Sequence, residues 1–117
     1  MDWMPSPPLA PFDSPLDLDH LSRMTLGDAD LEQEVLAMFA EQAVRLLAAM
    51  AAMPAETGPL AHKLKGSARG VGAFAVADAA ASLEMAARTG HGRADAFAAL
   101  KEAVTEARAA IEAILKP

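Results

Sequence analysis

Apolar residues recur at every third or fourth position along most of the chain, and this spacing constrains the fold more than any other feature of the sequence. Residues at i, i+3 and i+4 share one face of an α-helix, so the spacing is typical of amphipathic helices. No alternating run of β-branched residues indicates a strand. The pattern predicts a short helix over about residues 17–24 and longer helices over about 30–53, 60–72, 75–89 and 94–115.

The segments between the predicted helices are short and contain proline or glycine. Asp28 or Asp30 is expected to cap the long helix after the first turn, and Thr57 to cap the helix that follows Pro54. Short connections make neighbouring helices antiparallel. The sequence therefore predicts an all-α fold, an antiparallel up-down-up-down four-helix bundle over residues 16–117, with the short first helix packed across it.

Residues 1–15 differ from the rest of the chain because proline is dense among small and apolar residues. Such a density forbids a regular helix or strand. We predict a flexible Pro-rich tail, because terminal segments are usually poorly ordered. Docking of Trp3 and Phe12 on the body of the domain is the less favoured alternative.

Composition limits the chain to one domain and excludes several classes of function. A chain of 117 residues can bury one hydrophobic core but cannot also hold a nucleotide-binding domain. The formal net charge of -6 argues against nucleic-acid binding, and the absence of cysteine excludes disulfides and thiolate metal sites. No apolar run approaches the roughly 20 residues that span a bilayer, so we expect a cytoplasmic protein with no membrane contact. Alanine-rich helical faces indicate tight packing, and Met38, Met50 and Met85 are interpreted as core filler.

One stretch carries residues suited to chemistry. His62, Lys65 and Gly66 share a helical face, opposite an apolar stripe that we expect to be buried. A neutral imidazole exposed to water is a nucleophile, and an ammonium one turn away can meet phosphoryl oxygens. Glycine costs about 1 kcal/mol relative to alanine inside a helix, so Gly66 indicates close approach of another molecule. The apolar stripe consists of Leu60, Leu64, Ala68 and Val71.

The run His62-x-Leu64-Lys65-Gly66-Ser67-Ala68-x-x-x-Gly72 resembles the signature of histidine-containing phosphotransfer (HPt) domains, the helical carriers of multistep phosphorelays. The resemblance covers roughly the last hundred residues, the size of one ordinary domain. It implies that His62 is the phosphoacceptor, that Lys65 steadies the phosphoryl group and that Gly66 admits a response-regulator receiver domain. Ala68 stands where many members carry a second serine.

The resemblance also implies a role for Glu84, which lies where family members often carry a glutamine or glutamate that hydrogen-bonds the phosphoacceptor imidazole. Such a bond fixes the tautomer of His62 and presents its other nitrogen as the nucleophile. The alternative is a solvated Glu84 paired with Arg88 at i, i+4. Arg69 is expected to have a peripheral docking role, with a merely solvated arginine as the alternative.

The receiver is expected to dock on apolar residues around His62, and the surplus apolar positions of the long helix are the candidates: Met38, Phe39 and Ala43. A metal site is disfavoured because His20, His62 and His91 fall on three separate segments without ligand spacing. No nucleotide-binding motif is present, so we expect no cofactor in this chain and Mg²⁺ on the partner receiver.

The function implied is reversible phosphoryl transfer between His62 and aspartyl phosphates of receiver domains, by a monomer that acts with a hybrid sensor histidine kinase. Two alternatives stay open. One is an HPt-like interaction module that binds a receiver or kinase without carrying phosphate. The other is an autonomous enzyme domain, either a metal-dependent hydrolase or the dimerising half of a histidine kinase, although such kinase helices usually have an acidic residue where Lys63 follows His62.

Overall fold

The computed structural model describes residues 14–116, and within this range it contains five helices and no strand. The predicted all-α class is therefore confirmed. Residues 1–13 of the predicted Pro-rich tail, which include Trp3 and Phe12, lie outside the described range. The helices are α1 (Leu18–Met24), α2 (Ala29–Met50), α3 (Thr57–Val71), α4 (Phe74–Thr89) and α5 (Arg93–Leu115).

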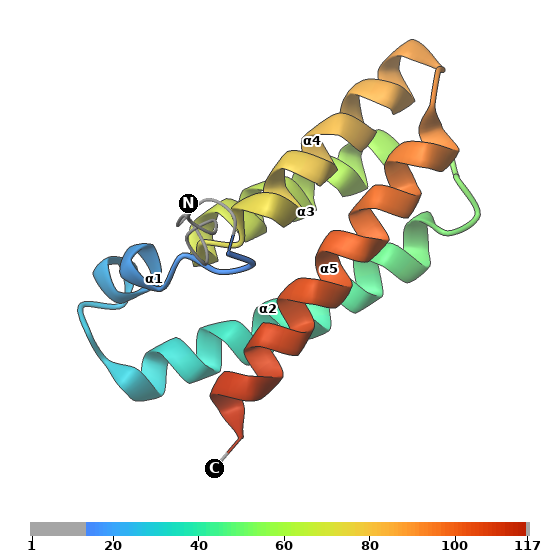
Figure 1. Ribbon diagram of the computed structural model, residues 1–117. Helices are drawn as coiled ribbons and strands as arrows, with labels where there is room; N and C mark the ends of the chain where they lie inside the picture. Colours follow the sequence, from blue (N-terminus) through green and yellow to red (C-terminus); the bar gives the residue numbers. More distant parts are fainter. Residues whose placement is uncertain (1–13, 117) are drawn as a thin grey trace, which may run out of the picture.

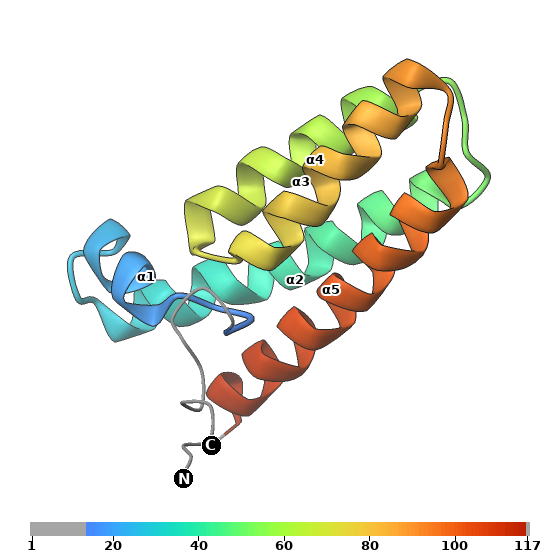
Figure 2. The ribbon, with the colours of Figure 1, turned by 45° about the horizontal axis from the view of Figure 1, so that its top comes forward.

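The four long helices form the body of the domain (Figure 1). Each runs antiparallel to the next, α3 packs most extensively against α4, and α2 also packs against α5, which closes the ring of four. Helix α1 lies at the end of the body where α3 finishes and α2 starts, and it packs against α3 (Figure 2). The short helix thus covers one end of the bundle.

The core consists largely of alanine together with leucine, valine and isoleucine. Small side chains let helix backbones approach closely and also favour the helical conformation. The fully buried alanines include Ala61 and Ala68 of α3 and Ala77 and Ala80 of α4. Close packing of α3 on α4 is the property of the core that matters for the site described below.

The buried residues of helix α2 are Leu36, Phe39, Ala43, Leu46 and Met50. Leu31 is exposed, and Met38 is 67 % exposed. The broad apolar pattern of α2 left its inner face ambiguous, and contacts with α3 and α5 decide it. Met50 is core filler as predicted, but Met38 and Met85 are at the surface.

The ends of the helices follow local hydrogen bonding. The Asp28 side chain caps α2 by accepting a hydrogen bond from the Leu31 amide at 3.1 Å. The prediction that Thr57 caps α3 is wrong, because Thr57 is already helical and its hydroxyl donates to the Pro54 carbonyl at 2.7 Å. Glu56 holds the capping position without a side-chain bond.

Helix α1 is fastened to the end of α3 through Asp17 and Gly72. The Asp17 amide donates to the Gly72 carbonyl at 2.8 Å, and the Asp17 side chain caps α1 by accepting from the His20 amide. The His20 ring packs edge-on against Phe74, with ring centroids 5.2 Å apart. The predicted place of His20 in the first helix is correct, and these contacts give it a packing role.

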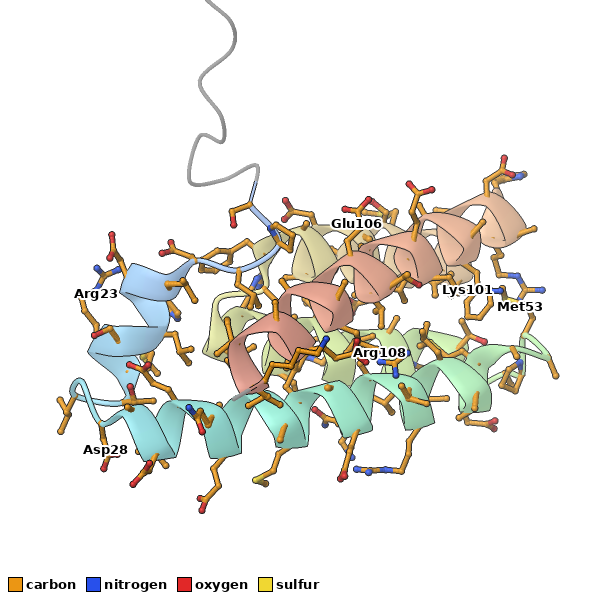
Figure 3. The ribbon with its side chains drawn as sticks, turned by 60° about the horizontal axis from the view of Figure 1, so that its bottom comes forward. Arg23, Asp28, Met53, Lys101, Glu106 and Arg108 are labelled. Atoms are coloured by element: carbon orange, nitrogen blue, oxygen red, sulfur yellow. The ribbon has the colours of Figure 1, made fainter. Side chains whose placement is uncertain are left out.

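The face formed by α2 and α5 is shown in Figure 3. Arg108 extends from α5 toward α2, where it lines a shallow pocket together with Val44 and Arg45. Charged side chains of both signs, including Lys101 and Glu106, project from α5.

Candidate functional site

His62 lies near the middle of α3 and points to solvent, with 66 % of its side chain exposed. The reason is the pattern of the helix, because Ala61, Leu64 and Ala68 are fully buried and turn the intervening positions outward. Val71 is buried as expected and Leu60 is partly buried against the core. The core therefore fixes the orientation of His62.

Glu84 reaches His62 from the neighbouring helix. The Nδ1 atom of His62 lies 2.9 Å from Oε2 of Glu84. The closely packed alanines of α3 and α4 bring the two backbones near enough for this contact across 22 residues of sequence. The carboxylate makes this contact rather than the alternative i, i+4 pair with Arg88.

Lys65 contacts the same carboxylate. Its Nζ lies 2.7 Å from Oε1 of Glu84, and the two side chains are 18 % and 23 % exposed. Glu84 therefore holds one donor on each oxygen, His62 on Oε2 and Lys65 on Oε1. The resemblance implied that Lys65 meets the phosphoryl group, and the structure places its ammonium on Glu84.

These contacts determine the charge state of Glu84 and the tautomer of His62. The hydrogen bond from Lys65 is the largest influence that lowers the pKa of Glu84, the bond from His62 adds to it, and partial burial opposes both. Glu84 is therefore ionised at neutral pH and can only accept hydrogen bonds. His62 must therefore donate through Nδ1–H, and in the neutral ring this leaves the lone pair on Nε2.

A pocket of about 520 Å³ adjoins His62 on the side of the loop before α3. Its walls include His62, Glu84 and Arg88, and its remaining lining consists of small residues and a proline: Ala55, Gly58, Pro59 and Ala87. Arg88 is exposed, and within the described residues its polar contact is Met85 Sδ at 3.9 Å. His62 thus lines a hollow that also carries the cation of Arg88.

Comparison with known proteins agrees with this geometry. A model of the Hpt domain family matches residues 34–110, more than half of the chain, including α3 and α4 in full. The chain belongs to the Hpt domain family. Searches of curated proteins and of solved structures gave no significant match. Hpt domains carry out histidine phosphotransfer in two-component phosphorelays, in which they interact with receiver domains.

Two further residues of α3, Gly66 and Arg69, have predicted docking roles. A Cβ atom built on Gly66 meets nothing within 4 Å, so the fold itself does not require glycine there. Arg69 is exposed, and it lies two turns after His62 on α3. It does not line the pocket beside His62.

The docking role of Phe39 stays a prediction: Phe39 lines a pocket of about 400 Å³ with Met38, but little of it is exposed. Phe39 is 3 % exposed and Ala43 is fully buried, so both belong to the core of this Hpt domain. Met38 is the exposed member of the predicted set. The pocket lies between α2 and α3, and its lining also includes Ser67 and Val71.

The sequence analysis did not predict that Arg88 lines a pocket beside His62. The available signal was its spacing, because Arg88 lies four residues after Glu84 and therefore on the same face of α4. Within residues 14–116, no three histidine or acidic side chains gather as metal ligands. No helix of that range has the length and apolar character needed to cross a membrane.

Proposed function

We propose that His62 accepts a phosphoryl group from the aspartyl phosphate of a receiver domain and passes it to the aspartate of another receiver. The observation that carries the proposal is the 2.9 Å contact between His62 Nδ1 and Glu84. In the neutral ring this contact leaves Nε2 unprotonated, and 66 % of the side chain is accessible to a partner. An unprotonated nitrogen on an exposed face is what a nucleophile attacking another protein requires.

The transfer of the phosphoryl group forms one bond and breaks another. The lone pair of His62 Nε2 forms a bond to phosphorus while the bond from phosphorus to the aspartyl oxygen breaks, and its electron pair returns to the receiver carboxylate. The proton on Nδ1 stays in place, so the phosphorylated ring is an imidazolium. The ionised Glu84 offsets that positive charge at 2.9 Å. No proton has to leave the site in either direction.

The remaining residues supply charge and access. Lys65 adds positive charge next to Glu84. The resemblance to the family implies that its ammonium also steadies the phosphoryl group. Gly66 leaves the backbone of α3 open to the receiver, and Arg69 contacts the receiver at the periphery. Mg²⁺ is supplied by the receiver, because phosphoryl transfer of this kind depends on positioning and charge stabilisation at the aspartate.

We further propose that the protein acts as a cytoplasmic monomer, with residues 16–117 as the folded domain, and that a hybrid sensor histidine kinase feeds the relay. Size-exclusion chromatography tests the monomer. A dimer would favour the dimerising half of a kinase instead.

The experiment uses a receiver domain carrying labelled aspartyl phosphate. We expect label to move to the wild-type protein as an acid-labile, base-stable phosphoryl group, and not to move to His62→Gln. His91→Gln is the matched control, because His91 is an exposed loop histidine after the end of α4 and does not line the pocket beside His62. Receiver binding without transfer would contradict the proposal and favour the interaction module.

A further inference from the structure

The turn between α1 and α2 holds a leucine where the end of a helix usually holds a glycine. The Gly27 amide donates to the Ser22 carbonyl at 2.8 Å. The Leu26 amide donates to the Arg23 carbonyl at 3.4 Å, and the two bonds together make a Schellman motif. Leu26 takes the left-handed position of this motif, with φ 55°. Glycine is usual at this position because a Cβ atom makes the conformation unfavourable.

The Leu26 side chain gives the fold no packing in return, because it is 93 % exposed. Two other large apolar side chains next to the turn are also exposed, Met24 at the end of α1 and Leu31 in the first turn of α2. We call Met24, Leu26 and Leu31 the corner surface. An unfavourable backbone conformation that serves to expose an apolar side chain indicates a contact with another molecule.

The charges around the corner surface are nearly all negative. Arg23 is the single basic residue between positions 17 and 34, and Figure 3 shows it across the turn from Asp28. Acidic residues near the start of α2 complement its macrodipole, but the macrodipole does not explain the exposed apolar side chains. A surface that combines apolar atoms with negative charge favours a basic partner. The six acidic residues are Asp17, Asp19, Asp28, Asp30, Glu32 and Glu34.

The corner surface and His62 lie at opposite ends of the bundle. The pocket beside His62 is lined by Ala55 and Gly58, which follow the end of α2, whereas the corner surface lies at its start. The 22 residues of α2 separate the two ends by about 33 Å, at 1.5 Å per residue. The corner surface also precedes residues 34–110, the part of the chain that the Hpt family model matches. A molecule on the corner surface would therefore leave His62 accessible.

We propose that the corner surface docks a basic segment of a partner protein, with Leu26 as the anchor. Leu26 packs among apolar side chains of the partner, while Asp30 and Glu34, both exposed, pair with its lysines or arginines. The bound segment would hold the domain at the end remote from His62. The proposal does not depend on the phosphotransfer function, because it concerns the unphosphorylated protein.

The probe is a synthetic peptide of leucine and lysine at helical spacing, titrated into the ¹⁵N-labelled full-length protein. We expect amide shifts centred on residues 24–31 and a dissociation constant that rises with salt concentration, because the charges are exposed. The same peptide with glutamate in place of lysine should not bind. Shifts centred on another part of the chain, or equal binding of the glutamate peptide, would overturn the proposal.

The anchor is tested by Leu26→Gly, with Met53→Gly as the matched control. Met53 also has a positive φ, 53°, but it lies in the connection between α2 and α3. Leu26→Gly should weaken binding about tenfold, and Met53→Gly should bind like the wild type. Both variants should keep or raise the midpoint of urea unfolding, because relief of the left-handed conformation offsets the greater freedom of glycine in the unfolded chain. A lower midpoint in Leu26→Gly alone would mean that Leu26 serves the fold, and would overturn the proposal.

The charges are tested by two double variants that change the net charge equally. Asp30→Asn with Glu34→Gln should weaken binding about tenfold and reduce its dependence on salt. Glu102→Gln with Glu106→Gln removes two exposed charges of α5 and should not change the affinity. Equal losses in the two double variants would indicate general attraction to an acidic protein and would overturn the proposal.

Two other occupants of the corner surface give distinct results in the absence of peptide. A dimer in size-exclusion chromatography that becomes a monomer in Leu26→Gly would assign the surface to a second copy of the chain. Trp3 is the single tryptophan of the sequence, so its fluorescence reports on residues 1–13 in the full chain. A change of that emission in Leu26→Gly would assign the surface to those residues. Either result would overturn the proposal, and we expect neither.

Discussion

Gly66 and Gly72 both lie in the Hpt signature, yet the structure uses them in opposite ways. Gly72 ends α3 in the left-handed conformation with φ +86°, and a Cβ atom there would lie 2.8 Å from the Asp17 carbonyl oxygen. Gly66 lies inside α3, and a Cβ atom there would meet nothing within 4 Å. The fold requires glycine at one position and merely tolerates it at the other.

The difference separates what the chain needs for folding from what it needs for a partner. The junction of α1 with α3 is built from backbone contacts, and Gly72 is buried within it. The exposed face of α3 around Gly66 has no internal reason to lack a side chain. The cost of glycine inside a helix, about 1 kcal/mol relative to alanine, is consistent with the proposed approach of a receiver at Gly66.

The largest expected effect is on stability, from Gly72→Ala. A residue with a Cβ atom in the left-handed region costs about 1–2 kcal/mol, and the contact with the Asp17 carbonyl also breaks the 2.8 Å hydrogen bond between Asp17 and Gly72. We expect the free energy of unfolding to fall by about 2–4 kcal/mol. Urea denaturation measures it.

The matched control is Gly90→Ala. Gly90 has φ +78°, almost the same conformation, but a Cβ atom there meets nothing within 4 Å. The difference between the two variants isolates the contact with Asp17 from the cost of the backbone conformation. Equal losses in both variants would mean that α1 moves away without cost and that the junction with α3 is not a stabilising contact.

Much of this junction was beyond prediction. Periodicity predicted α1 and the end of α3 near Gly72, because local patterns report which residues are helical. Nothing local reports which two helix ends meet, so the Asp17 bond to Gly72 and the contact of His20 with Phe74 emerged only from the structure. The fold class and the packing of α1 across the bundle were predictable, whereas the particular contacts that attach α1 were not.

The second prediction concerns the open face of α3. Gly66→Ala should leave the fold intact or stabilise it by up to about 1 kcal/mol, since alanine favours helix. If a receiver approaches the backbone at Gly66, the same variant should lower the rate of phosphoryl transfer from a receiver about tenfold, equivalent to roughly 1.4 kcal/mol. Transfer assays and urea denaturation on one sample give both values.

Gly70→Ala serves as the comparison for Gly66→Ala, because Gly70 lies one turn further along α3 and its Cβ atom would also meet nothing within 4 Å. It should share the gain in stability. Its effect on transfer should be smaller, since it is two turns from His62. Unimpaired transfer in Gly66→Ala would remove the docking role of this glycine.

The candidate site was predicted in part, and for identifiable reasons. The spacing of His62, Lys65 and Gly66 is a local pattern on one helix, which a sequence reports directly. The resemblance supplied Glu84, but the attachment of Lys65 to Glu84 depends on how closely α3 packs on α4. The burial of Phe39 was not predicted, because the apolar pattern of α2 is too broad to separate its inner face from its outer one.

The smallest expected effect tests whether Glu84, with its contacts to His62 and Lys65, is needed for folding, as Gly72 is, or for a partner, as Gly66 is expected to be. Glu84→Gln removes a carboxylate whose pKa is held below its ordinary value of 4.5, chiefly by the hydrogen bond from Lys65. A carboxylate whose pKa is lower in the folded state than in the unfolded state stabilises the protein at pH values above the unfolded pKa. That stabilisation is lost as the pH falls through the lowered pKa of the folded state. Because the side chains of Glu84 and Lys65 are 23 % and 18 % exposed, we expect about 1 kcal/mol or less at pH 7.

The measurement is the free energy of unfolding of the wild type and Glu84→Gln by urea denaturation from about pH 7 to about pH 3. The two proteins should differ at neutral pH and converge in acid. His62 donates from Nδ1 in both its neutral and its protonated form, so protonation of the ring does not remove the contact. A loss well above 1 kcal/mol at neutral pH would place Glu84 with Gly72 among the residues that the fold requires. A small loss combined with slow phosphoryl transfer would place it with Gly66, because its contacts would then serve the reactivity of His62 more than the stability of the bundle.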